Sequence, residues 1–305
     1  MSNVASCVAG NLATVAFASE FEIHTIKASP GQSSTHEEKL APVAGKSFKK
    51  QRAADAAIQA QANKLLRAFN TWSFKREQPS DPQLMLRVIA DAIAAQAAIP
   101  FVLYWGKGPR HQSSAHELQC LDFLAALAAR IKNVYAHGAA IKLILTDTHA
   151  ELNGHSREQI QQYFNDIETI AGQRGFETCW LGHLVKAAGN LAAAAPIDEA
   201  VSAEMLAKLM ASAEKWYHGG GTAQEGALTY LRMNLIEQRV VERAFPGSIF
   251  ITFNGSELRS LFPRQLPIFY MYSLRRGVAV KPWFLASESK NTEVSAGQEN
   301  PPRPL

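Results

Sequence analysis

Two short polar segments hold most of the residues that could do chemistry, and each follows an apolar run. The first is residues 106–110, Gly-Lys-Gly-Pro-Arg, which comes directly after the apolar run 99–105. Lys107 supplies a point charge and Arg110 a planar fork, and both suit phosphate or carboxylate. Gly106 lets the backbone approach a ligand closely. The segment is neither a P-loop nor a dinucleotide fingerprint, and an ordinary basic surface loop would have the same composition.

The second polar segment begins with Asp147-Thr-His149, after the apolar run 141–146. Asp147 could orient an imidazole or act as a base, and His149 is a candidate general acid and base. Asn153, in the turn pair Asn-Gly, could bind a carbonyl or an amine of a substrate through its amide. The alternative is that Asp147 caps a loop and that His149 is an ordinary surface histidine.

A third set of charged residues interrupts the apolar pattern of residues 222–245. Arg232 and Glu237 are five residues apart and therefore do not form a simple i,i+4 surface pair. One of the charged side chains is expected to face the site. Arg232 is favoured because it follows Tyr230 and Leu231, while Arg239 has the pattern of a solvated face.

Metal binding and cysteine chemistry are not expected from this sequence. His149 and His155 are six residues apart, without the compact ligand spacing of common zinc motifs. Cys120 lies on a patterned helical segment and Cys179 in an apolar run, so both are expected in the core. Three scattered cysteines make no disulfide framework, and a reducing, cytoplasmic setting is the default.

Strands and helices that alternate along the chain must position these residues. The pattern predicts an α/β fold: a Rossmann-like, mostly parallel sheet flanked by helices, with a C-terminal β-containing extension. In such sheets ligands bind beyond the carboxyl ends of the strands, which gathers the loops 106–114, 147–155 and 182–183 at one edge. Strands are expected over 99–105, 141–146, 176–181, 248–253, 266–273 and 278–283, the last two as a hairpin, and helices over 53–69, 83–97, 115–135, 156–173, 197–217 and 222–245.

Length and composition set the domain organisation. The 305 residues predict one α/β catalytic domain over 51–286, with a helical subregion at 190–221. Residues 1–50 and 287–305 are expected to be a disordered arm and tail. The net charge of +4 predicts no nucleic-acid partner and fits small acidic or phosphorylated substrates. No apolar run reaches the roughly 20 residues needed to cross a bilayer, so no membrane partner is expected.

The order of several motifs resembles the core of the isonitrile (isocyanide) synthases of the pyoverdine/paerucumarin and dityrosine type. The similarity covers about residues 100–163 and is looser over Tyr230, Arg232, Glu237 and the Pro-Trp pair at 282–283. Departures indicate a divergent subgroup: Gly-Pro-Arg at 108–110 and Thr-His at 148–149 replace the family's usual residues, and the usual Arg-Leu-Ser-Ile-His segment is absent near 249–253. The motifs are Pro100-Phe-Val-Leu103, Gly106-Lys-Gly-Pro109, His116-Glu117, Tyr135, Gly138-Ala139, Leu145-Thr-Asp147, Ile160 and Tyr163.

This resemblance implies an enzyme that condenses the amine of an amino acid with the ketone of ribulose 5-phosphate. The adduct then fragments and leaves one sugar carbon as the isonitrile carbon, with no metal or nucleotide cofactor. Lys107 and Arg110 would hold phosphate or carboxylate, Asp147 and His149 would move protons, and Arg232 would be a second anion anchor. A Schiff base on Lys107 is the lesser option.

The resemblance also implies substrate-binding roles for Gly106, Glu117 and Asn153. Two other functions stay open: another sugar-phosphate-binding transferase or lyase, and a non-catalytic small-molecule-binding accessory protein. The sequence leaves open a homodimer and the identity of the amino acid.

Overall fold

The structure is a computed structural model. The chain divides into two compact units, residues 1–58 and 59–305, and the second contains the whole sheet. The predicted tail, the strand over 278–283 and its hairpin turn lie outside the described residues, as does the arm up to residue 43. The structure describes residues 44–105, 115–189, 202–217, 219–253, 255–256 and 264–271.

Five parallel strands form one sheet in the order β3-β2-β1-β4-β5, which confirms the predicted fold class. The central strand β1 pairs with β2 from Ile99–Ala139 to Trp105–Leu145, so the two strands end level at their carboxyl ends. The strands are β1 Ile99–Trp105, β2 Ala139–Leu145, β3 Glu177–Trp180, β4 Ile249–Thr252 and β5 Ile268–Tyr270.

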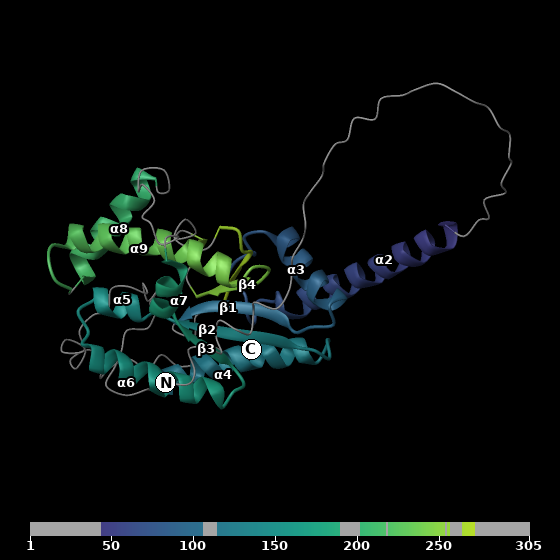
Figure 1. Cartoon of the computed structure of the whole chain (residues 1–305), viewed down its shortest axis with the longest axis horizontal. Helices are drawn as coiled ribbons and strands as arrows, with labels where there is room; N and C mark the ends of the chain where they lie inside the picture. Colours follow the sequence, from purple (N-terminus) through teal and green to yellow (C-terminus); the bar gives the residue numbers. More distant parts are fainter. Residues whose placement is uncertain are drawn as a thin grey trace, which may run out of the picture. The chain divides into compact units, whose positions relative to one another are not determined.

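Helices cover both faces of this sheet (Figure 1). In that view α4 and α6 lie below the strands and α8 and α9 lie above them, while α5 and α7 lie at the left-hand end of the strands. The helices are α2 Ala44–Phe69, α3 Pro82–Ala94, α4 Ala115–Lys132, α5 Asp147–Leu152, α6 Arg157–Gly172, α7 Leu181–Ala188, α8 Ala203–Trp216 and α9 Ala223–Ala244. Among the described residues, no helix combines the length and apolar character that a membrane span requires.

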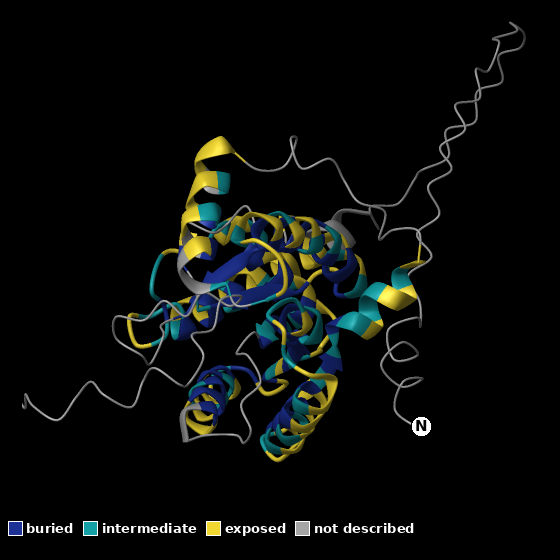
Figure 2. Cartoon of the chain, turned by 90° about the vertical axis from the view of Figure 1, so that its left-hand side faces the viewer, coloured by how far each residue is buried: buried dark blue, intermediate teal, exposed yellow. Residues whose placement is uncertain are grey.

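Alternation along the strands sends successive side chains to different helical layers. Leu103 and Trp105 belong to the large core cluster shared with helices α4 and α6. Tyr104, between them, contacts the rings of Phe250 and His149 on the other face. Figure 2 shows buried residues at the centre of the protein, and every residue of β4 and β5 is buried. The sheet therefore separates two side-chain environments at the same carboxyl edge.

Capping residues fix where several helices begin. Ser156 and Gln159 form the predicted capping box at the start of α6, each bonding the other's backbone. Thr222 and Glu225 do the same for α9. Asp81 caps α3 by accepting a hydrogen bond from the backbone N–H of Leu84. These capping signals can be recognised in the sequence. They fix the residue at which each helix begins.

Three boundaries differ from the predictions. Helix α2 begins at Ala44 rather than at residue 53, because residues 44–52 include Lys, Gln and Arg, which favour helix, and no proline. Residues 147–152, expected as a loop, form helix α5. Gly182 and His183, also expected in a loop, belong to α7, because the chain turns into a helix directly after β3.

The described C-terminal strands belong to the main sheet. Strand β5 pairs in parallel with β4, through Phe250–Ile268 to Thr252–Tyr270, and is an edge strand of the main sheet. Met271 makes an isolated antiparallel bridge to Lys75. The described β-structure near the C-terminus is therefore part of the central sheet.

Candidate functional site

A buried histidine–carboxylate pair lies just beyond the carboxyl end of β2. His149 Nε2 is 2.7 Å from Glu237 Oε2, and the two side chains are 3% and 2% exposed. The other carboxylate oxygen of Glu237 accepts a 2.8 Å hydrogen bond from the hydroxyl of Thr148. Both carboxylate oxygens of Glu237 are thus in polar contacts, one with the imidazole of His149 and the other with the hydroxyl of Thr148.

The turn after β2 positions His149. The hydroxyl of Thr146 donates a 2.9 Å hydrogen bond to the carbonyl oxygen of Trp105, at the end of β1. Helix α5 begins at the next residue, Asp147, and buries its third residue, His149. The short helix thus places the imidazole against α9, next to the strand ends.

Helix α9 positions Glu237. Tyr230, Asn234, Glu237 and Val241 are all buried and recur every three or four residues, so they share one face of the helix. Asn234 donates its amide to the carbonyl oxygen of Tyr230 at 3.2 Å. Arg232 is exposed and lies off this buried face. The charged residue of α9 that meets α5 is therefore Glu237, whereas sequence reasoning favoured Arg232.

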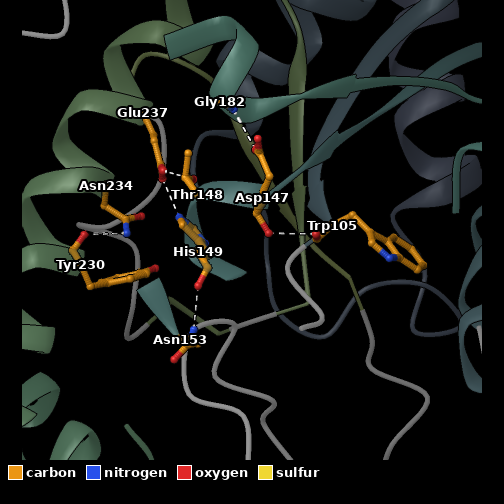
Figure 3. Close-up of polar contacts among 10 residues, drawn as sticks. Trp105, Asp147, Thr148, His149, Asn153, Gly182, Tyr230, Asn234 and Glu237 are labelled. Atoms are coloured by element: carbon orange, nitrogen blue, oxygen red, sulfur yellow. Dashed lines mark hydrogen bonds and ion pairs between the residues drawn. The ribbon is translucent and has the colours of Figure 1, made fainter. Parts of the chain in front are cut away.

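Two buried tyrosines flank the imidazole. The ring centroid of His149 lies 5.2 Å from that of Tyr230 and 6.2 Å from that of Tyr104. Burial, and then the charge of Glu237, raise the pKa of both tyrosines well above the ordinary value. Both hydroxyls therefore stay protonated at neutral pH. Figure 3 shows His149 between Glu237 and Asn153, with the ring of Tyr230 beside it.

Asp147 joins α5 to α7. Its Oδ1 accepts a 2.8 Å hydrogen bond from the backbone N–H of Gly182, in the first turn of α7. A Cβ atom on Gly182 would lie only 2.5 Å from Oδ2 of Asp147, so any larger residue would force the carboxyl group or the backbone to shift. Desolvation is the largest influence on this carboxyl and raises its pKa, against the backbone hydrogen bond that lowers it. Asp147 therefore has a structural contact that the sequence did not predict.

Asn153 ends α5 one turn after His149. Its amide donates a 2.9 Å hydrogen bond to the carbonyl oxygen of His149. Asn153 Oδ1 and His149 Nδ1 are buried atoms with no hydrogen-bond partner in the described part of the chain. These two predicted site residues thus lie together in the structure.

Glu117 lies in a separate buried cluster. It is fully buried in the first turn of α4, and the hydroxyl of Tyr163 donates to it at 3.5 Å. Trp105 Nε1 donates to that same hydroxyl at 3.3 Å. Because Trp105 and Tyr104 point to different faces of the sheet, Glu117 and His149 belong to different layers at one edge.

Three predicted anion-binding residues, Gly106, Lys107 and Arg110, lie outside the described residues. Of the predicted site residues that the structure describes, it brings together His149 and Asn153, adjacent to Asp147. Glu237 was missed as a site residue, although its place in the buried i, i+3, i+4 pattern of α9 is a signal that could have identified it. No group of three or more His, Cys, Asp or Glu side chains in the described ranges could hold a metal ion.

The fold and site define an α/β protein with a parallel sheet and buried polar groups at its carboxyl edge. No known family model matches the chain, and no curated protein matches it. Its fold is similar to that of the PvcA protein from Pseudomonas aeruginosa, with a TM-score of 0.57 and 20% identity over 73% of this chain and 87% of PvcA. A looser likeness is to the tyrosyl-tRNA synthetase from Pyrococcus horikoshii, with a TM-score of 0.41 and 14% identity over 66% of this chain and 52% of the synthetase.

Proposed function

We propose that this protein is an isonitrile-synthase-like enzyme that condenses the amine of an amino acid with ribulose 5-phosphate. The observation that carries the proposal is the buried His149–Glu237 pair at the carboxyl edge of the sheet. Imine formation and carbon–carbon cleavage both need a group that takes up and returns protons, and a histidine held by a carboxylate suits that task. No metal or nucleotide cofactor is needed for this scheme.

Two comparisons support the proposal. The sequence resembles the isonitrile synthases over residues 100–163, which contain β1, β2 and α5. The fold is similar to that of the PvcA protein from Pseudomonas aeruginosa. His149 itself is a departure from the family's usual glycine, so the proton-transfer group of this chain is its own.

The proposed roles of the remaining residues follow the chemistry of the substrates. Lys107 and Arg110 bind the phosphate or the carboxylate, and the backbone at Gly106 admits the ligand. Arg232 is the second anion anchor in this scheme. Glu117 and Asn153 bind polar groups of the substrates, and Asp147 assists proton transfer.

The test is incubation of the full chain with ribulose 5-phosphate and each of the common amino acids. The expected result is a product with an isonitrile stretch in the infrared and the corresponding mass. His149→Gln should lower the rate by about a hundredfold or more, as removal of a general acid and base does. His137→Gln is the matched control, because His137 is exposed and precedes β2 at the opposite edge of the sheet. Absence of product, together with no thermal shift by ribulose 5-phosphate, would refute the proposal.

A further inference from the structure

Two buried polar atoms, on α5 and on the residue that ends it, lack a hydrogen-bond partner among the described residues. His149 Nδ1 and Asn153 Oδ1 have no hydrogen-bond partner in the described ranges. The two residues are four apart in one helical turn and therefore lie on the same side of α5. A polar atom that is buried without a hydrogen-bond partner loses its contacts with water and gains none in return, which costs free energy. Such a pair is therefore a sign of a ligand.

The orientation of each acceptor is fixed by a second contact. Nε2 of His149 lies 2.7 Å from Oε2 of Glu237, and this contact fixes the ring so that Nδ1 is the nitrogen left for a ligand. The amide nitrogen of Asn153 donates to the carbonyl oxygen of His149, which turns Oδ1 away from the helix backbone. Oδ1 of Asn153 can only accept a hydrogen bond, and Nδ1 of His149 accepts one when the ring carries its proton on Nε2.

The surroundings favour a cationic donor. Glu237 brings a carboxylate to the other side of the imidazole, and Tyr230 and Tyr104 place aromatic rings near it. Aromatic faces and a carboxylate attract an ammonium group. We propose that His149 Nδ1 and Asn153 Oδ1 bind the ammonium group of the amino-acid substrate, and that Nδ1 takes its proton; this assignment rests on the proposed function.

The proton transfer balances within the site. One N–H bond of the ammonium breaks, its electron pair stays on the amine nitrogen, and an N–H bond forms at Nδ1 of His149. The amine becomes a neutral nucleophile, and the positive charge moves to the imidazole, beside the carboxylate of Glu237. Glu237 is thus a positioning residue, which sets the tautomer of His149 and stabilises the imidazolium.

Calorimetry on the full chain tests the binding site. Each of the twenty L-amino acids is titrated with and without ribulose 5-phosphate, and the tightest binder is compared with its N-acetyl derivative. His149→Gln retains a donor toward Glu237 but removes the Nδ1 acceptor, and Asn153→Ala removes Oδ1. Each variant should weaken binding by about tenfold or more, and N-acetylation should do the same. His137→Gln and Asn133→Ala, exposed residues near the opposite edge of the sheet, should change nothing.

Nitrogen NMR of the histidine-labelled protein tests the role of Glu237 without an activity assay. His149 should carry its proton on Nε2 in the free protein and gain one on Nδ1 when the amino acid binds. Glu237→Gln should abolish the preference for one tautomer and leave the signals of the other histidines in place, which a general loss of structure would not do.

Two results would overturn the inference. One is an amino-acid affinity that stays unchanged in both His149→Gln and Asn153→Ala, as expected if water or another part of the chain satisfies the acceptors. The other is equal binding of the N-acetyl derivative. If wild type forms isonitrile while either result holds, only the amine site fails. If binding depends on both residues while no product forms, the proposed reaction fails and the amine site stands.

Discussion

His149 and Glu237 lie 88 residues apart in sequence and form a 2.7 Å contact that is shielded almost completely from water. One residue comes from the short helix after β2, and the other from the long helix that covers the same face of the sheet. Removal of either member leaves the other as a buried polar group without its partner. The pair therefore supports stability as well as the proposed chemistry, and the two contributions can be measured separately.

Glu237→Ala should destabilise the protein by about 3 kcal/mol, because it leaves His149 and Thr148 without their acceptor in a buried place. Urea denaturation followed by circular dichroism measures this loss. Arg232→Ala on the same helix is the control and should change the free energy of unfolding by less than about 0.5 kcal/mol, since Arg232 is exposed. Equal effects of the two substitutions would contradict the importance of the pair.

Gly182→Ala should destabilise the protein by about 1–3 kcal/mol, because the new Cβ would meet Oδ2 of Asp147 at 2.5 Å. Thermal unfolding measures the change. Gly172→Ala is the matched control, since a Cβ there has no neighbour within 4 Å and alanine favours helix more than glycine does. If the two substitutions shift the melting temperature alike, the close contact between α5 and α7 does not constrain residue 182.

Asp147 should make the folded protein more stable at low pH than at neutral pH. Desolvation raises its pKa in the folded state, so the folded protein holds this proton more tightly than the unfolded chain does. That stability is present below the unfolded pKa and is lost as the pH rises through the folded pKa. The free energy of unfolding of Asp147→Asn should therefore rise relative to that of wild type as the pH increases from about 3 to about 7. Unfolding measured across this range checks the slope, and a flat difference between the two proteins would argue against it.

Glu225 should contribute to stability with the opposite pH dependence. The backbone N–H and the hydroxyl of Thr222 lower its pKa, so its contribution to stability is present above the unfolded pKa and lost as the pH falls through the folded pKa. The free energy of unfolding of Glu225→Gln should therefore fall relative to that of wild type as the pH rises over the same range. The two series of unfolding measurements should slope in opposite directions, and parallel slopes would refute one of the two assignments.

Lys107→Ala should weaken the binding of ribulose 5-phosphate by about tenfold or more, because a phosphate contact from a cation is lost. Isothermal titration of the full chain gives the dissociation constant. Lys64→Ala, an exposed lysine on α2, removes the same charge elsewhere and should leave the affinity unchanged. Arg232→Ala in the same titration tests the second anion anchor. Unaltered affinity in Lys107→Ala would remove that residue from the proposed phosphate site.

The sequence by itself determined the parts of the fold that depend on neighbours along the chain. Apolar runs of strand length predicted β1 and β2, and the cap residues Ser156 and Gln159 predicted the start of α6. Both signals act within a few residues, through side-chain periodicity or hydrogen bonds to the nearby backbone. The sequence also placed His149 at the end of a strand, which is where the site lies.

Only the tertiary structure decided which charged residue of α9 meets that histidine. Arg232 and Glu237 are both charged interruptions in an apolar pattern, and one is exposed while the other is buried. Which of the two side chains is buried depends on how α9 is rotated against α5. Many packing contacts across the sheet determine that rotation together. The same packing turned the predicted loop at Asp147 into a helix that bonds Gly182. The periodicity of α9 can mark Glu237 as a buried position, but no local signal names its partner. The free energy that selects contacts between residues far apart in the chain comes from burial in the assembled fold.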